Sequence, residues 1–313
     1  MGKGFYNLGN TCYLNSALQC LSHIPTFRHD NELFIKDISK RDNNNDYKLM
    51  ELWLNLQKDI WDNDEIKIIN TKDILNEIIN RCRKNNINFE LFDQNDSNDF
   101  LNVFIDFLHN SIKREVNITI KGTPKNKYDS LKVDSIKSWR NFFGDNYSYI
   151  IENCYSQLLS LTSCPNCKNI TSNHEPMMTI ALTLKNNFNT IYDCFDEFIE
   201  EEVLDVNNQW LCEKCNQKVN PHKKSTFWKL SDVLILSIKQ FRLSGKLNKH
   251  IDFPEYLDLS KYLITSKNEN NYKLYGLCIH NGSLNGGHYY AICRDFKTDH
   301  WNIYNDTDVK STT

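Results

Sequence analysis

The segment GFYNLGNTCYLNSALQCL, residues 4–21, predicts a cysteine at the start of a helix. Apolar residues recur in it at the i, i+3, i+4, i+7 spacing of a helix: Leu14, Ala17, Leu18 and Leu21. Pro25 ends this pattern. At a helix N-terminus the macrodipole and unpaired backbone N–H groups favour thiolate, the form that attacks carbonyls. Cys12 is therefore a candidate nucleophile, although one such cysteine is more often a small buried hydrophobe.

A second segment, YGLCIHNGSLNGGHYYAICRDFKTDHWNIYND at residues 275–306, supplies a candidate base. His288 follows a Gly-Gly pair, and Asn305 and Asp306 follow beyond a tryptophan. A histidine with an amide or carboxylate partner is able to hold one tautomer and to accept the proton of a thiol. The two segments together predict a split cysteine–histidine active site.

The sequence around these residues resembles that of the ubiquitin-specific proteases, a family of deubiquitinating cysteine enzymes. The strings NLGNTCYLNSALQCL and YxLxxxxxHxGxxxxGHYxAxxR, with WxxYND after them, are similar to the family's Cys and His boxes. Three further landmarks occur in the family order: QNDSNDFL (94–101), LILSIKQFRL (234–243) and IDFPEYLDLSKYL (251–263). Asn95 and Gln240 depart from the family pattern at positions away from the chemistry. The resemblance covers residues 4 to about 309.

The resemblance implies a role for each residue of the predicted site. Cys12 attacks the carbonyl after a C-terminal Gly-Gly, and His288 is the base. Asn305 stands at the position of the third triad member; Asp306 is also able to accept from the imidazole, and the family pattern favours Asn305. Asn7 matches the asparagine of the oxyanion hole, and a plain turn residue is the alternative for it.

The resemblance also implies a channel for an extended, basic ubiquitin tail. Asp96 and Asp99 match acidic positions that the family uses against the tail, and a helix cap is the alternative reading. Gly286 and Gly287 leave room for a substrate backbone. Tyr289 matches the aromatic that flanks the Gly-Gly passage, with an ordinary strand aromatic as the alternative.

A four-cysteine set predicts one structural zinc ion. Its members form two CxxC pairs separated by 44 residues: Cys164 with Cys167, and Cys212 with Cys215. Four thiolates make a closed tetrahedral site with no open catalytic position. The pairing is similar to the zinc ribbon of the family's "fingers" subdomain, and a redox motif or unrelated buried cysteines are the alternatives.

The chain is expected to form a single α+β catalytic domain over residues 1–313, with the papain-like architecture that the resemblance implies. A helical lobe is expected to about residue 116, with helices at 50–61, 71–82 and 96–112, the last capped by Asp96 or Ser97. Residues 117–147 indicate a mobile insertion or loop. Fingers are expected at about 148–230 and a β-rich lobe at about 231–313.

Within the two β-rich parts, strands are expected in five segments and a short helix in one. The strand segments are 177–184, 225–241, 272–280, 288–294 and 300–305, and the helix is 193–202. Relatives usually continue into a final apolar strand, whereas this chain stops seven residues after Asp306, so an open sheet edge is expected there. No appended targeting or ubiquitin-binding domain is expected.

Composition favours an enzyme of the cytoplasm or nucleus. The net charge of −3 argues against nucleic acid or an anionic membrane as the partner. Eleven cysteines without an export signal indicate reduced thiols, and no apolar run has the length of a membrane span. A monomer that acts on ubiquitin and ubiquitinated proteins is expected. A ubiquitin-binding pseudoenzyme or adaptor, and a protease for a ubiquitin-like modifier or for ordinary peptides, remain alternatives.

Overall fold

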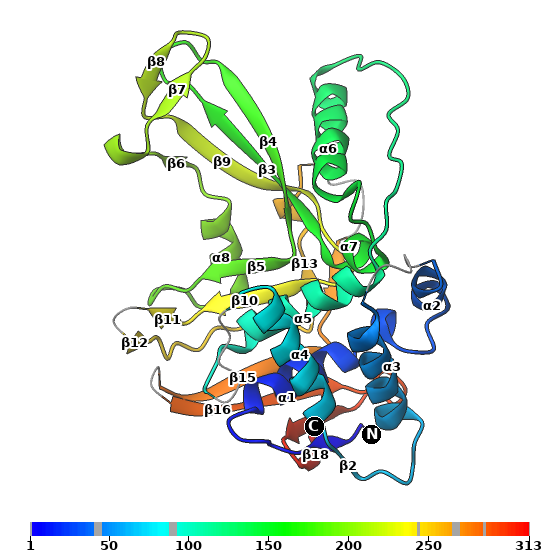
Figure 1. Ribbon diagram of the computed structural model, residues 1–313. Coiled ribbons are helices and arrows are strands. Elements are labelled where there is room, and N and C mark those ends of the chain that lie inside the picture. The colour runs from blue at the N-terminus through cyan, green and yellow to red at the C-terminus, as the bar shows by residue number, and fades with distance from the viewer. Residues whose placement is uncertain are drawn as a thin grey trace.

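The computed structural model describes residues 2–40, 46–87, 93–242, 245–264, 270–283 and 286–312. Figure 1 shows a helical part, a raised sheet with a long helix beside it, and a lower sheet that holds the end of the chain. The helices are α1 (Cys12–Ser22), α2 (Glu32–Ile38), α3 (Lys48–Trp61), α4 (Lys72–Lys84), α5 (Ser97–Ile112), α6 (Lys127–Phe143), α7 (Tyr149–Cys154) and α8 (Ile191–Phe198).

The helical part is built around α1, which packs against α5 on one side and against the lower sheet on the other. Leu14 and Leu18 of α1 are fully buried in one core with Trp53 and Phe104, whose rings meet edge to face at 5.6 Å. Apolar burial of this kind is the main stabilising term in folding. Helix α5 begins with Asp96 as its cap, because Asp96 Oδ1 accepts from the Asn98 N–H at 2.7 Å.

The raised sheet has the order β4-β3-β9-β6. Its strands are β3 (Ser156–Ser163), β4 (Ile170–Met177), β6 (Glu202–Val203) and β9 (His222–Lys229). Strands β3, β4 and β9 pair antiparallel over most of their length. A small hairpin of β7 (Trp210–Cys212) and β8 (Gln217–Val219) lies at the tip of this sheet (Figure 1). We refer to the raised sheet and this hairpin together as the fingers.

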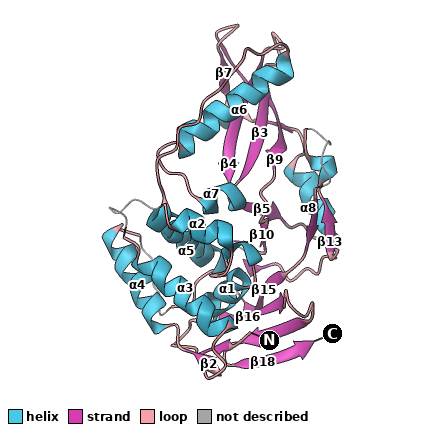
Figure 2. Cartoon of the chain, turned by 90° about the vertical axis from the view of Figure 1, so that its right-hand side faces the viewer, coloured by secondary structure: helices cyan, strands magenta, loops and turns pink. Residues whose placement is uncertain are grey.

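The lower sheet has the order β15-β16-β17-β18, all antiparallel. Its strands are β15 (Gly276–Ser283), β16 (Gly286–Arg294), β17 (Trp301–Asn305) and β18 (Asp308–Thr312). Four pairs complete the described strands: β1 (Gly4–Phe5) with β2 (Ile68–Ile69), β5 (Thr179–Thr183) with β10 (Ile235–Lys239), β11 (Phe241–Arg242) with β12 (Gly245–Lys246), and β13 (Tyr256–Asp258) with β14 (Asn271–Lys273). Figure 2 shows the helical part lying on one side of the lower sheet.

Residues 127–143 form helix α6, so the expectation of a loop over 117–147 is wrong for this stretch. Asn126 caps the helix by accepting from the Asp129 N–H at 2.8 Å. The helix packs on β4, and Ser135 donates to Gln157 Oε1 at 2.7 Å. Trp139 lies under the Lys229 ammonium at 5.6 Å. The charged residues between these contacts hide the helical period in the sequence.

The residues after Asp306 form one more strand, and this strand is itself an edge of the lower sheet. Residues Asp308–Thr312 are polar except for Val309, yet they form β18 and pair with all of β17. A two-residue turn at Asp306 and Thr307 makes this return, and Asp306 has a positive φ of 50°, which aspartate tolerates better than most residues. Elsewhere, the strand expected at 225–241 is split between β9 and β10, and α7 lies in a region expected to be mostly strands.

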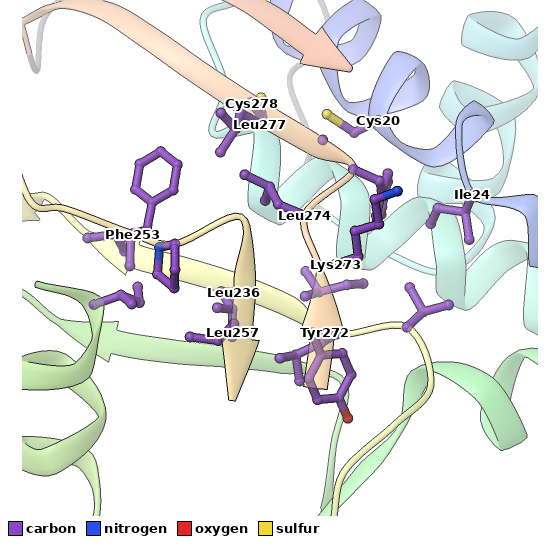
Figure 3. A pocket seen from close by; sticks show the side chains of 18 of the residues that line it. Cys20, Ile24, Leu236, Phe253, Leu257, Tyr272, Lys273, Leu274, Leu277 and Cys278 are labelled. Atoms are coloured by element: carbon purple, nitrogen blue, oxygen red, sulfur yellow. The ribbon is translucent and has the colours of Figure 1, made fainter. Parts of the chain in front are cut away.

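A cavity of about 1240 Å³ lies between α1, β10 and strands β13 to β15. Figure 3 shows its apolar lining, which includes Leu236, Leu257 and Leu274, with Cys20 and Cys278 at one end. None of the predicted catalytic residues lines it. Among the described residues, no helix has the length and apolarity to cross a bilayer.

Candidate active site

The predicted nucleophile is the first residue of helix α1. Cys12 is nearly buried, with 6% exposure, and the preceding Thr11 makes no side-chain cap. The first N–H groups of a helix lack intrahelical acceptors, so the Cys12 N–H remains available to a ligand. The sulfur therefore lies where the helix dipole favours negative charge.

The predicted base and its partner meet at the edge of the lower sheet. His288 Nε2 lies 2.6 Å from Asn305 Oδ1, whereas Asp306 Oδ2 is 4.0 Å from the same nitrogen. Because Asn305 Oδ1 accepts from Nε2, the proton occupies Nε2 and leaves Nδ1 free to take a proton from a thiol. The His288 side chain is 42% exposed, so its ring is accessible from solvent.

Asp306 is held from two sides by asparagine amides. Its Oδ2 accepts from Asn7 Nδ2 at 2.9 Å, and its Oδ1 accepts from Asn15 Nδ2 at 2.7 Å. Asn7 also organises the turn before the helix, because its Oδ1 accepts from the N–H groups of Gly9 and Thr11 at 3.1 and 3.2 Å. Asp306 thus accepts one of the two hydrogens of the Asn7 amide.

Helix α1 packs directly on β16, which brings the two distant segments of the sequence together. In the described chain, no hydrogen bond joins the Cys12 thiol to the His288 ring. Catalytic hydrogen bonds in substrate-free enzymes are often long and tighten only with substrate bound. The structure thus assembles Asn7, His288, Asn305 and Asp306 by direct contact, and places Cys12 on the helix that faces them.

Residues predicted to meet a substrate tail gather where α5 begins beside β16. Gln94 Oε1 accepts from the Gly287 N–H at 3.2 Å. Tyr289 lies beside Asp96 and Ser97, and burial together with the Asp96 charge raises the pKa of its phenol. Asp99 is the third residue of α5, and desolvation with the neighbouring Asp96 charge raises the pKa of its carboxyl. This corner carries two carboxylates, and its Gly287 and Tyr289 flank His288 in the sequence.

The two glycines before His288 differ in their surroundings. A Cβ at Gly287 would lie 2.3 Å from His280 Nε2 and 2.6 Å from the Asn281 carbonyl oxygen, so the chain itself requires glycine here. At Gly286 the nearest atom would be Gln94 Oε1, 3.7 Å away, so this side is open. Room for a substrate backbone therefore exists beside Gly286 rather than on the side-chain face of Gly287.

The four predicted metal ligands meet at the tip of the fingers. Their sulfurs all lie within 4.8 Å of one another, with Cys164 and Cys212 fully buried. Two of the sulfur pairs, Cys164–Cys215 and Cys167–Cys212, are 3.8 and 3.5 Å apart. Tetrahedral zinc with Zn–S bonds of about 2.3 Å separates its sulfurs by about 3.8 Å, so the cluster fits this ion.

Both CxxC pairs have the same backbone geometry. The N–H four residues after the first cysteine donates to the carbonyl of that cysteine, Lys168 to Cys164 at 3.1 Å and Asn216 to Cys212 at 2.8 Å. Lys168 and Asn216 both have positive φ. The backbone N–H of Cys215, with that of Lys214, lowers the pKa of Cys212 to about 6. Aimed N–H groups therefore favour thiolate at this corner of the cluster.

Sequence reasoning missed three residues that shape the site. Gln94 holds Gly287, His280 fills the space beside Gly287, and Asn15 holds Asp306. Each of them lies inside a motif, but no spacing rule links it to its partner. An asparagine in the first turn of a buried helix was the one available signal, because asparagine is a poor residue for a helix interior.

Comparison with known proteins defines the class. A sequence model of the family described as "Ubiquitin carboxyl-terminal hydrolase" matches residues 3–313. This chain belongs to that family. Human ubiquitin carboxyl-terminal hydrolase 2 is 30% identical over 98% of the chain, which covers 51% of that protein. The probable ubiquitin carboxyl-terminal hydrolase R319 of Acanthamoeba polyphaga mimivirus is 26% identical over 97% of the chain and 85% of its own length.

Solved structures share the fold. Ubp8 in the SAGA DUB module bound to monoubiquitin superposes with a TM-score of 0.74 at 24% identity, over 99% of this chain and 65% of that one. The module bound to ubiquitin aldehyde gives 0.73, also at 24% identity, over 99% and 66%. Ubp8 belongs there to a multi-protein module, which does not fit the monomer expected from the sequence. The chain spans about half the length of the ubiquitin carboxyl-terminal hydrolase 2 proteins that it matches.

Proposed function

We propose that this chain is a thiol-dependent deubiquitinase that cleaves the peptide or isopeptide bond after the C-terminal Gly-Gly of ubiquitin. The observation that carries this proposal is the contact of His288 with Asn305, made on a sheet that packs against the helix beginning at Cys12. Membership of the ubiquitin carboxyl-terminal hydrolase family supports ubiquitin as the substrate. The proposed partners are ubiquitin and ubiquitinated proteins.

The reaction follows from the protons that each side chain is able to move. His288 Nδ1 accepts the Cys12 proton, and the thiolate attacks the glycine carbonyl. The tetrahedral oxyanion receives the Cys12 N–H and the second Asn7 N–H. Imidazolium then protonates the leaving lysine amine, which leaves a thioester on Cys12. His288 next takes a proton from water as the water oxygen attacks the thioester carbonyl. Collapse of this second tetrahedral intermediate breaks the C–S bond, releases the ubiquitin carboxylate and restores the Cys12 thiolate beside the imidazolium.

The acidic corner beside His288 is proposed to hold the ubiquitin tail. Asp96 and Asp99 carry negative charge at the first turn of α5, which complements a basic tail. The open side of Gly286 and the ring of Tyr289 border the route to Cys12. Because this corner is acidic and open beside Gly286, it suits a basic, extended tail that ends in residues without side chains.

The cysteine cluster is proposed to hold one structural zinc ion through Cys164, Cys167, Cys212 and Cys215. Bound zinc would cross-link the two CxxC pairs, because each pair comes from a different hairpin of the fingers. All eleven cysteines of the chain are free thiols that form no disulfide. This supports a reducing compartment, and we propose the cytoplasm or the nucleus.

A covalent probe tests the proposed activity. Ubiquitin carrying a C-terminal electrophile should attach to wild-type protein and to Cys20→Ala, a matched control two turns further along α1. It should not attach to Cys12→Ala, and this variant should also lose turnover of a ubiquitin–fluorophore conjugate while it still binds ubiquitin. Peptide mapping of the adduct to a residue other than Cys12, or full turnover by Cys12→Ala, would refute the assignment.

A further inference from the structure

Asn15, three residues after Cys12, is an unfavourable residue for the stability of the fold at its position. Asn15 is 3% exposed and lies in the first turn of α1. Asparagine is a weak helix former. In the described chain its Oδ1 is buried without a hydrogen-bond partner, an arrangement that destabilises a folded protein. Stability of the helix therefore does not explain this side chain.

The other end of the Asn15 amide joins three segments. Its Nδ2 donates to Asp306 Oδ1 at 2.7 Å and to the Tyr6 carbonyl oxygen at 3.2 Å. Asp306 belongs to the turn between β17 and β18, and Tyr6 belongs to the segment that leads into the oxyanion turn. One amide thus ties the nucleophile helix to the turn after Asn305, the partner of the base, and to the segment that leads to Asn7.

The consequence is a fixed direction for the Asp306 carboxylate. With Oδ1 bound by Asn15, Oδ2 is directed toward Asn7 Nδ2 at 2.9 Å and lies 4.0 Å from His288 Nε2. Without the Asn15 donor, a rotation of this carboxylate would loosen both Asn7 and the negative charge beside His288. The Asp306 side chain is only 17% exposed, so water replaces the lost donor poorly.

We propose that Asn15 is a positioning residue: it holds the Asp306 carboxylate beside His288 and Asn7, and so sets base and oxyanion donor relative to the helix of Cys12. Asn15 does not touch the reacting atoms. The role rests on the proposed hydrolysis by Cys12, and it adds a residue outside the predicted Cys–His–Asn set.

Three variants test this role. Asn15→Leu keeps the shape and removes the donor, Asp306→Asn removes the charge and keeps the turn, and the third variant combines both changes. We expect Asn15→Leu to lower kcat by about 10- to 100-fold with little change in KM, the loss typical of one hydrogen bond to a charged group. In the Asp306→Asn background the same change should add less than about threefold, because the two residues act through one contact.

A donor–acceptor exchange separates positioning from plain structural support. The double variant Asn15→Asp with Asp306→Asn restores a hydrogen bond between α1 and the turn but moves the carboxylate to the helix. We expect its Tm to return toward wild type while kcat stays low. Full recovery of kcat would overturn the proposal, as would an Asn15→Leu variant with wild-type kcat or additive losses in the combined variant.

Alkylation of Cys12 by iodoacetamide gives a readout that needs no ubiquitin. A slower alkylation of Cys12 in Asn15→Leu than in wild type supports the role of Asn15, and equal rates contradict it. A wild-type protein that is alkylated at Cys12 but cleaves no ubiquitin substrate would instead contradict the proposed function. The two failures are therefore distinguishable.

Discussion

Asn305 and Asp306 are predicted to share the support of His288 in unequal and separable parts. Asn305 accepts directly from the ring at 2.6 Å, whereas Asp306 is 4.0 Å away and is itself bound by two amides. Asn305 fixes the tautomer but is neutral. Asp306 contributes charge, which matters only when the imidazolium forms in the transition state. The two contributions should therefore differ in origin.

The magnitudes follow from these distances. A hydrogen bond to a charged ring is worth about 1.5–3 kcal/mol, so Asn305→Ala should cost about 10- to 150-fold in kcat/KM. Two unit charges 4.0 Å apart attract by about 4 kcal/mol at an effective dielectric constant of 20 and by about 1 kcal/mol in water. Because the His288 side chain is 42% exposed, about 2 kcal/mol is reasonable, or about 30-fold for Asp306→Asn. Together the two changes should approach three decades.

The assay is kcat/KM on one ubiquitin–fluorophore conjugate for both single variants and the double variant. Asparagine is the right replacement for Asp306, because it tolerates the φ of 50° that the turn requires. Asp308→Asn is the matched control, since that carboxylate lies on β18 and pairs with Lys310 at 2.6 Å. A double variant no slower than Asn305→Ala alone would show that Asp306 has no separate catalytic part.

Four further outcomes are expected. Removing zinc with a chelator, or replacing Cys212 by serine, should unfold the tip of the fingers, which loss of hydrogen-exchange protection in β7 and β8 would show; active protein without zinc by elemental analysis contradicts this. Gly287→Ala should destabilise the fold by more than about 1 kcal/mol, whereas Gly286→Ala should fold normally, because only a Cβ at position 287 would lie within 3 Å of other atoms. Equal urea midpoints for the two variants would refute the argument. Phe104→Ala should cost about 3–5 kcal/mol of unfolding free energy in the α1–α5 core, measured by urea denaturation against the partly exposed control Leu101→Ala. Burial lowers the pKa of His23 to about 4, so its neutral form stabilises the fold above pH 6.5, and up to about 3 kcal/mol should be lost as the pH falls from 6.5 to 4; His23→Gln should flatten this part of a stability profile, and an unchanged slope would contradict it.

The residues that meet in the candidate site were predictable because short motifs, together with the family resemblance, identify them. A cysteine at a helix start and a histidine followed by an asparagine are visible in short strings, and the structure does place Cys12 first in α1 and Asn305 against His288. The cysteine cluster was predictable for the same reason, since two CxxC pairs present four sulfurs whatever the length between them. Helix α6 was not predicted from the sequence, because its few packing contacts are spread among charged residues.

The supporting contacts were not predictable because they depend on how distant backbone segments meet. No spacing in the sequence predicts the hydrogen bond from the Gly287 N–H to Gln94. The same holds for the close packing of His280 beside that glycine. The return of the chain after Asp306 was likewise not predictable, because a strand with a single apolar residue shows no apolar alternation. Tertiary pairing with β17 decides that segment, as it often does for strands.

The same contacts explain how a site divided between the two ends of the chain becomes one unit. The turn that follows Asn305 is closed by β18, and its Asp306 carbonyl accepts from the Phe5 N–H at 2.8 Å while its carboxylate meets Asn15. The turn therefore binds the segment that leads to Cys12 through backbone and side chain together. His288 and Asn305 lie on neighbouring strands of that sheet. Contact of this turn with α1 therefore fixes the position of the base relative to the nucleophile. Weakening β18 should consequently lower activity before it unfolds the protein.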